Sequence, residues 1–351
     1  MKFKEYLLKD IATITMGQSP KSQFYNEDGK GIEFLQGVRT FGEDFPYFDT
    51  YTTKYNRLAY KNSILFSVRA PVGRVNWATK NIAIGRGVAS ISVKNMVYDR
   101  YVYYYFKKMG SFYDKKATGT VFTSINKKEL ESLKIKVPAS YDDQKRIADR
   151  LATLDRKIHL NQQLNANLDE IKTAYFDKSF NQQMQSNLNG KLKNITKITS
   201  GKRPNKKSDT KSSKDKYPIV GASKVMGYTD NYLYNEPILT TGRVGTHGII
   251  QRFREPVWVS DNSFVFKTDH EDYLFEILNH WINYSALNRG STQPLITQTD
   301  LKNIDIYVPT ESELKKFEMV SRILTNLQFS LIKQNRRLDQ IKKTLLNKLL
   351  L

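Results

Sequence analysis

The sequence has no cysteine and only four histidines, His159, His247, His270 and His280. Without thiols the chain can form neither disulfide bonds nor a cysteine nucleophile, which suits a reducing, cytoplasmic compartment. The histidines show no metal-ligand spacing, so we expect no metal site. Apolar runs of about eighteen residues, which a membrane span requires, are missing, and the amino terminus lacks the apolar core of a signal peptide.

Common catalytic motifs are also missing. The chain contains neither a GxxxxGK[ST] phosphate loop nor a GxGxxG turn after a strand, and no serine or threonine lies in a nucleophile-elbow setting. Asp114, Glu131 and Lys134 have a loose nuclease-like spacing, which makes a nuclease the alternative from the enzyme class. We interpret the chain as non-catalytic, with no catalytic residue, no metal and no cofactor of its own.

Positive charge is what the chain has in excess. Lysine and arginine number 56 against 35 aspartates and glutamates, so the formal net charge is +21 and the pI is about 9.7. Such a balance is typical of a protein that binds a polyanion, and we expect nucleic acid as the partner. A membrane surface is a weaker expectation because the chain has no basic amphipathic helix of the interfacial kind. A soluble basic protein without such a partner remains an alternative.

Two long stretches without proline or glycine carry apolar residues at helical spacing, and both contain the sequence LDxIK. The apolar positions of the first are Ile147, Leu151, Leu154, Ile158, Leu168, Ile171 and Tyr175, and those of the second are Phe317, Val320, Leu324, Leu327, Leu331, Leu338, Ile341 and Leu345. A straight helix of forty residues would reach about 60 Å. We predict an antiparallel coiled coil, with two unrelated surface helices as the alternative.

The segments that precede these helices repeat one pattern. Each opens on a strand that leads into a Gly-x-x-Pro turn, and each closes on a glycine loop, a short helical turn, a strand and a proline. Residues 100–109 are predicted as a helix, with a strand as the alternative. Residues 181–191 are expected to form a hinge, and the lysine-rich residues 205–216 either a solvated loop or a phosphate-tracking arm.

The repeat indicates an α+β fold with a pseudo-twofold internal repeat. It consists of two similar mixed α/β domains and two long spacer helices that form the antiparallel coiled coil. The expected bounds are 1–140 and 183–310 for the domains, and 141–182 and 311–351 for the helices.

A register for the coiled coil follows if Leu168 meets Leu331. Asn161 and Asn165 then share the central layers with Gln334 and Asn335, and such buried amides would penalise slipped registers. The predicted opposing pairs are Leu154 with Leu345, Ile158 with Ile341, and Tyr175 with Leu324; Leu338 completes the helix-pairing set. Inserting four residues near Asn161 would lengthen the rod by roughly 6 Å.

Arginine, lysine, hydroxyl and amide side chains in the loops are the candidates for DNA binding, because cations contact phosphates and these polar groups can read base edges. In the first domain the candidates are Gln18, Lys21, Arg39, Arg69, Arg74, Arg86, Thr118, Thr120 and Ser124. In the second they are Lys202, Arg203, Lys206, Lys207, Ser223, Arg243, Asn262, Ser291, Thr292, Gln293 and Thr297.

These features resemble the DNA-specificity subunit of type I restriction-modification systems over essentially the full length. The resemblance rests on Gly17 to Pro20 and Gly201 to Pro204, on the domain ends at Pro138 and Pro309, and on residues 142–148 (DDQKRIA), which resemble the family's helix start. The second copy departs from the pattern, because residues 312–317 (SELKKF) lack the glutamine.

The resemblance implies a non-catalytic subunit in which two target-recognition domains each read one half of a split double-stranded DNA sequence. The helices would set the spacer and dock two modification subunits, which methylate adenine with S-adenosylmethionine, and restriction subunits would join through them. The alternatives are a free-standing DNA-binding regulator or architectural protein, and a specificity chain of a fused restriction-methylation enzyme.

Overall fold

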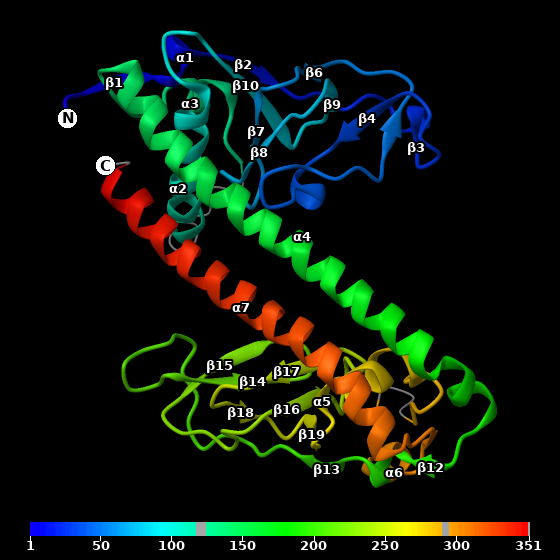
Figure 1. Cartoon of the computed structure of the whole chain (residues 1–351). Coiled ribbons are helices and arrows are strands. Elements are labelled where there is room, and N and C mark those ends of the chain that lie inside the picture. Colours follow the sequence, from blue (N-terminus) through cyan, green and yellow to red (C-terminus); the bar gives the residue numbers. More distant parts are fainter. Residues whose placement is uncertain (117–123, 290–294, 350–351) are drawn as a thin grey trace. The chain divides into compact units, whose positions relative to one another are not determined.

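The computed structural model describes residues 1–116, 124–289 and 295–349, which divide into two compact units (Figure 1). The first unit consists of Met1–Leu160 and Gln334–Leu351, and the second of Asn161–Lys333. Each unit therefore combines a globular part with segments of both long helices, α4 (Tyr141–Ser186) and α7 (Glu311–Leu349). In the described part of the chain, no helix has both the length and the apolar character needed to cross a membrane.

The globular part of the first unit contains three sheets in the described residues. The central antiparallel sheet has the order β2 (Ala12–Met16), β10 (Val88–Val93), β7 (Ile64–Ser67) and β8 (Val75–Trp77). A second sheet has the order β3 (Tyr25–Asn26), β5 (Tyr51–Thr52), β4 (Ile32–Leu35), β9 (Ile82–Ile84) and β6 (Leu58–Ala59), in which β4 and β9 are parallel. The third sheet pairs β1 (Phe3–Leu7) with β11 (Lys134–Pro138).

The helices of this globular part are short apart from α2 (Asp99–Lys116), which confirms the helix predicted for residues 100–109. Its Tyr101 and Phe106 are buried against the central sheet together with Phe66, Ile147 and Leu151, so the start of α4 belongs to the core. The remaining helical elements are α1 (Leu8–Ile11), η1 (Ser22–Phe24), η2 (Val38–Thr40) and α3 (Lys127–Glu131).

The second unit repeats this order. Its central sheet is β13 (Lys197–Ser200), β19 (Ser263–Lys267), β16 (Ile238–Gly242) and β17 (Gln251–Phe253). The smaller sheet is β15 (Val225–Thr229), β14 (Tyr217–Val220) and β18 (Trp258–Val259), and β14 and β18 are parallel as β4 and β9 are. β12 (Gly190–Lys191) pairs with β20 (Asp305–Ile306). The helical elements are η3 (Leu192–Asn194), α5 (Glu271–Glu276), the π-helical turn η4 (Ile277–Trp281) and α6 (Gln298–Lys302).

Gly17 and Gly201 show how closely the two domains correspond. The backbone N–H of Gly17 donates to the carbonyl oxygen of Val88, and that of Gly201 donates to Ser263. A Cβ atom at either glycine would lie 2.2 Å from a carbonyl oxygen of the neighbouring chain segment. The Gly-x-x-Pro openings therefore need glycine because two backbones approach each other there. The predicted internal repeat is confirmed by the matching topology.

Within the second unit, α4 and α7 run antiparallel. Gln328 donates to the carbonyl oxygen of Asn165 at 3.1 Å and to the carboxylate of Asp169 at 2.8 Å. The ring of Tyr175 stacks on that of Phe317 with the centroids 5.4 Å apart. Residue numbers therefore rise along α7 as they fall along α4, which is antiparallel pairing.

The first unit shows the same orientation, but its register differs from the predicted one. The Asn335 amide donates to the carbonyl oxygen of Ile158 at 3.3 Å, where Ile341 was expected. Tyr175 in the second unit likewise meets Phe317 instead of Leu324. The Asn335 and Phe317 contacts lie six and seven residues from the predicted pairing, or nearly two helical turns, whereas the ion pair of Lys342 with Asp155 lies two residues from it. Aromatic stacking and amide-to-carbonyl bonds set the alignment, and a pattern of leucines does not reveal them.

The helix-pairing residues differ in burial. Ile158, Asn161, Leu168 and Leu331 are buried, Leu154, Asn165, Tyr175, Leu324, Asn335, Leu338 and Leu345 are half-buried, and Gln334 and Ile341 are exposed. Ile341 is 49 % exposed and Ile171 52 %, so neither lies in the buried seam as predicted. Lys172 and Lys342, which follow these isoleucines in the sequence, are buried instead.

The expected hinge at residues 181–191 is helical over its first half, because α4 continues to Ser186. Met184 is only 1 % exposed and extends the buried positions of Phe176 and Phe180 by one more turn. These three side chains join the core of the second unit with Tyr273 and Phe317. Burial of the apolar face thus keeps the polar segment helical.

Candidate nucleic-acid interface

Three of the candidate arginines of the first domain line one pocket of about 360 Å³, which we call the arginine pocket. Its lining residues are Ser19, Phe34, Gln36, Gly37, Val38, Arg39, Thr40, Asp49, Thr50, Arg69, Ala70, Arg86 and Gly87. Arg39 lies in η2 just after β4, Arg69 follows β7, and Arg86 lies between β9 and β10. These arginines lie far apart in the sequence, and the fold brings them together.

Strand topology explains why these loops converge. Parallel neighbours β4 and β9 end at the same edge of their sheet, with Leu35 opposite Ile84. The backbone N–H of Gly85 donates to the carbonyl oxygen of Leu35 at 2.8 Å, and that of Gly87 donates to Gln36 at 3.0 Å. The loops that carry the arginines are therefore fastened to each other by their backbones.

Arg39 is held in the arginine pocket by Asp49. Its Nη1 and Nη2 donate to the two carboxylate oxygens of Asp49 at 2.5 and 2.8 Å. Thr50 donates a further bond to the same carboxylate at 2.9 Å. The Arg39 hydrogen bonds lower the pKa of Asp49 below its ordinary value, so the carboxylate is charged at neutral pH. Asp49 was not among the predicted residues, and nothing in its local sequence indicated this role.

Gln18, Lys21, Arg74 and Ser124 are exposed in the first domain. Lys21 lines a separate hollow with Phe24, Lys54 and Tyr55, among others. Thr118 and Thr120 lie outside the described residues.

In the second domain, Lys202, Arg203, Lys206, Lys207, Ser223 and Asn262 are exposed, and Arg243 and Thr297 are half-buried. Lys206 donates to Asp215 at 2.7 Å, so part of the charge of the lysine-rich segment is compensated within it. Ser291, Thr292 and Gln293 lie outside the described residues.

Thr297 has a structural task. Its hydroxyl accepts the backbone N–H of Asp300 at 3.1 Å and donates to the Asp300 carboxylate at 2.6 Å, which caps α6. Both bonding directions of the hydroxyl are thereby used, and a cap of this kind contributes about 1 kcal/mol.

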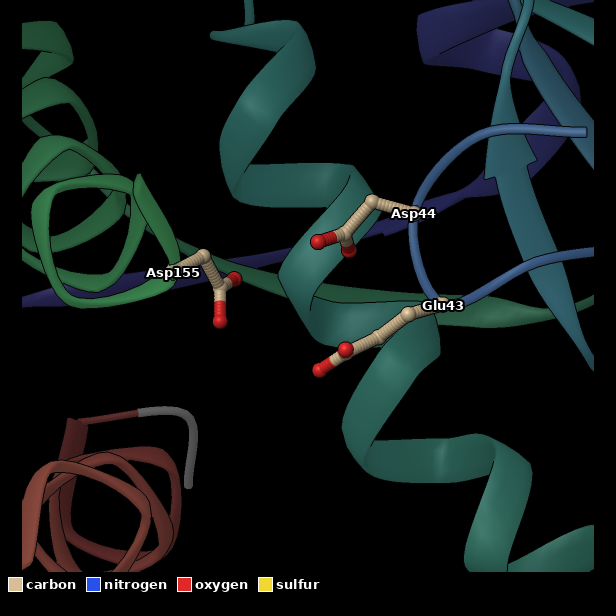
Figure 2. Close-up of side chains that lie close together, drawn as sticks. All are labelled: Glu43, Asp44 and Asp155. Carbon is tan, nitrogen blue, oxygen red and sulfur yellow. The ribbon is translucent and has the colours of Figure 1, made fainter. Parts of the chain in front are cut away.

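An acidic cluster in the first unit has the appearance of a cation site. Glu43 and Asp44 extend from a loop and Asp155 from α4, and their carboxylates face one another (Figure 2). Lys107 pairs with Asp44, and Lys342 of α7 pairs with Asp155. These two ammonium groups supply the positive charge that the carboxylates need.

Two tyrosines of α2 complete this network. Tyr103 donates its hydroxyl to Asp44 and Tyr104 donates to Asp155, each at 2.7 Å. Burial acts to raise the pKa of Asp44, but Lys107 outweighs it, and the pKa of Asp44 lies below its ordinary value. The network therefore fastens the globular part to α4 and α7 as ion pairs, and we interpret it as structural.

The second unit has a related joint around Lys172 of α4. The Lys172 ammonium lies 3.1 Å from the Asp169 carboxylate and 5.1 Å from the ring centroid of Phe275 in α5. The neighbouring Glu276 accepts a hydrogen bond from Thr173 at 3.1 Å. Burial raises the pKa of Glu276 to about 7, although Lys172 acts against that shift.

Gln144, from the helix-start motif, also has a structural role. Its side chain is buried, donates to the carbonyl oxygen of Pro138 at 2.9 Å and accepts the backbone N–H of Tyr98 at 2.8 Å. The second helix starts differently, because Thr310 and Glu313 form hydrogen bonds to each other's backbone N–H groups. The lost glutamine is thus replaced by a different helix start.

Comparison with known proteins agrees with this architecture. A family model described as the type I restriction modification DNA specificity domain matches residues 1–170 and 186–343. A Methanocaldococcus jannaschii protein, provisionally named the type I restriction enzyme MjaX specificity subunit, is 41 % identical over 160 residues, which cover 45 % of this chain and 37 % of that protein. The match thus spans less than half of that relative's length.

Two further comparisons cover more of the chain. The type I restriction enzyme MjaVIII specificity subunit of the same organism is 25 % identical over 308 residues, or 75 % of this chain and 72 % of that protein. The crystal structure of a type I restriction-modification S subunit from M. genitalium has a TM-score of 0.66 at 18 % identity and covers 100 % of this chain and 96 % of that one, which shows a common fold. With the family model matching both halves, the chain belongs to the type I restriction-modification DNA specificity family.

Proposed function

We propose that the chain is the non-catalytic DNA-recognition subunit of a type I restriction-modification complex, and that each globular domain reads one half of a bipartite target. The observation that carries this proposal is the duplication itself, with two domains of one topology whose loop residues differ. Two domains with the same fold but different loop residues are suited to recognising two half-sites of different DNA sequence. The net charge of +21 suits a DNA partner.

The helices are proposed to set the spacer between the half-sites and to dock two modification subunits. Exposed apolar side chains support the docking, because large apolar groups on a helix surface are characteristic of partner contacts. On α7 the residues Met319, Ile323 and Leu327 repeat every fourth position and are 68, 66 and 42 % exposed. Leu164 and Ile171 of α4 are also exposed.

The chemistry is assigned to the partners. The modification subunits would bind S-adenosylmethionine and methylate adenine in the cytoplasm, and restriction subunits would join through them. This chain would supply the DNA sequence preference and the surface on which the modification subunits dock.

Selection from a random duplex library tests the proposal. The full chain, together with any subunit that copurifies, is incubated with random-sequence duplexes, and the bound fraction is sequenced. We expect two conserved half-sites separated by a spacer of constant length. A single continuous site bound by the chain alone would favour a free-standing regulator. Cleavage of the duplex by the isolated chain with Mg²⁺ would contradict the non-catalytic assignment.

A further inference from the structure

The arginine pocket holds two kinds of arginine. Arg39 is paired through both terminal nitrogens with Asp49, whereas the described residues offer no hydrogen-bond or ion-pair partner to the guanidinium groups of Arg69 and Arg86. The Arg39 side chain is nevertheless 72 % exposed. It is oriented by a carboxylate and still open to a ligand, which distinguishes it from a buried structural arginine.

The Arg39 to Asp49 geometry leaves a specific set of donors. A guanidinium group has five N–H donors, and the end-on pair with Asp49 uses two of them. One side edge, formed by Nε–H and the adjacent terminal N–H, remains available. A parallel pair of donors matches the O6 and N7 acceptors of guanine in the major groove. Because Asp49 fixes the plane of the guanidinium group, less side-chain freedom is lost when a base binds.

Phosphate is the other anionic group that the pocket could meet. A phosphate contact needs positive charge but little angular precision, which suits Arg69 and Arg86, whose guanidinium groups have no partner among the described residues. Both are exposed, follow strand ends and line the pocket. The two kinds of arginine therefore suit two tasks, reading a base and holding the backbone.

The second domain provides an internal comparison. The bridge between Arg69 and Ser124 corresponds to the bridge between Val244 and Leu295, so Val244 occupies the place of Arg69. The bond from Gly85 to Leu35 corresponds to the one from Ser260 to Val220, which places Asp261 where the first domain has Arg86. Two of the three arginines are thus a valine and an aspartate in the second domain.

From these observations we propose that Arg39, oriented by Asp49, reads a guanine in the half-site bound by the first domain, while Arg69 and Arg86 hold the adjacent phosphates. This assignment rests on the proposed DNA-recognition function and deepens it. The second domain lacks the matching cations at two positions, so its half-site is read by other contacts.

The test uses the full chain with any copurifying subunit and the random duplex library. Arg39→Ala is expected to abolish the preference for G·C at one position of one half-site and to leave the other half-site unchanged. At that position, discrimination should fall on the order of ten- to a hundredfold, as expected for one bidentate contact. Asp49→Asn should broaden the preference at the same position, because the guanidinium group is no longer held.

Two further variants separate charge from geometry. Arg39→Lys keeps the charge without the forked donors, so it should lose the guanine preference as well. Arg69→Ala and Arg86→Ala should weaken binding to all sequences alike, and each should reduce the slope of log Kd against log salt by about 0.9. Arg100→Ala, in the same domain but outside the pocket, is the matched control for charge and should change neither quantity.

Other outcomes overturn the assignment. If Arg39→Ala weakened all sequences equally, Arg39 would be a phosphate contact. If the selected motif stayed unchanged, Arg39 would not contact DNA. Arg39→Lys keeps the charge and is therefore a second test if Arg39→Ala fails to fold. If the folded lysine variant kept the guanine preference, Arg39 would not make a forked contact with guanine. A wild-type chain that selects no motif would instead refute the underlying proposed function.

Discussion

Lys172 and Lys342 occupy the same position in the duplicated LDxIK sequence, and they are only 2 and 9 % exposed. The isoleucine before each is about half exposed, the reverse of what hydrophobicity predicts. Lys172 forms an ion pair with Asp169 in the second unit, and Lys342 forms one with Asp155 in the first. Both aspartates lie on α4. The long aliphatic stem of lysine can fill apolar space while its ammonium reaches a carboxylate, which isoleucine cannot do.

Loss of the Lys342 ammonium should destabilise the first unit. Lys342→Met leaves the half-buried Asp155 without its closest cation, since Lys107 lies 3.9 Å away. Breaking one partner of such a pair costs about 3 kcal/mol. Chemical denaturation of the full chain measures this loss. Lys343→Met, an exposed neighbour, is the matched control and should stay within about 0.5 kcal/mol. Adding Asp155→Asn should restore part of the stability, and no recovery would argue against the ion pair as the cause.

Alanine should be tolerated at Gly37 but not at Gly17 or Gly201. A Cβ atom at Gly17 or Gly201 would lie 2.2 Å from a carbonyl oxygen, whereas at Gly37 it meets nothing within 4 Å. We expect each of the first two variants to lower the free energy of unfolding by roughly 1–3 kcal/mol, because backbone must move. Gly37→Ala should change it by less than about 0.5 kcal/mol. Equal effects at all three positions in denaturant titrations would contradict the close-approach explanation.

Glu276 should make the second unit less stable as the pH rises. Burial raises its pKa from 4.5 to about 7 in the folded state, although Lys172 and Arg252 oppose that shift. The folded state therefore binds a proton that the unfolded state releases. The resulting stability is fully present below about pH 4.5 and is lost as the pH rises through 7. Glu276→Gln should consequently stabilise the chain at pH 8 by on the order of 3 kcal/mol.

Denaturant unfolding at pH 4 is the control for this variant. At pH 4 the glutamine variant and the wild type should unfold at nearly the same denaturant concentration, because the carboxyl group is protonated in both folded and unfolded chains. Glu318, whose pKa burial also raises to about 7, contributes a similar dependence in both proteins. The quantity to compare is therefore the difference in the free energy of unfolding between the glutamine variant and the wild type at each pH. A difference that does not vary with pH would rule out titration of Glu276.

A longer helix pair should lengthen the spacer of the target. Seven residues inserted beside Asn161 and seven beside Gln334 preserve the heptad phase and add about 10 Å of helix. That length is on the order of three base pairs. The duplex selection should then return unchanged half-sites with a spacer longer by about three base pairs. An insertion in only one helix is the control, because it mismatches the pair. If the half-sites themselves changed, the helices would not act as a spacer.

Local chemistry in the sequence was sufficient for the outline of the fold. The Gly-x-x-Pro openings, the closing prolines and the two long segments without helix breakers recur in order, and backbone sterics restrict each of them. The glycine at 17 and 201 is required by close backbone approach in both copies. The internal repeat and the long helices could therefore be predicted from one chain.

Tertiary structure decided which side chains meet. The arginine pocket depends on β4 and β9 being parallel neighbours, a pairing between segments about fifty residues apart in sequence. Asp49 became part of it only through that fold. The helix register likewise depended on Tyr175 stacking on Phe317 and on where lysine could find a carboxylate. Spacing along a chain reports which face a residue shares, whereas the partner on that face is chosen by packing and charge between distant segments.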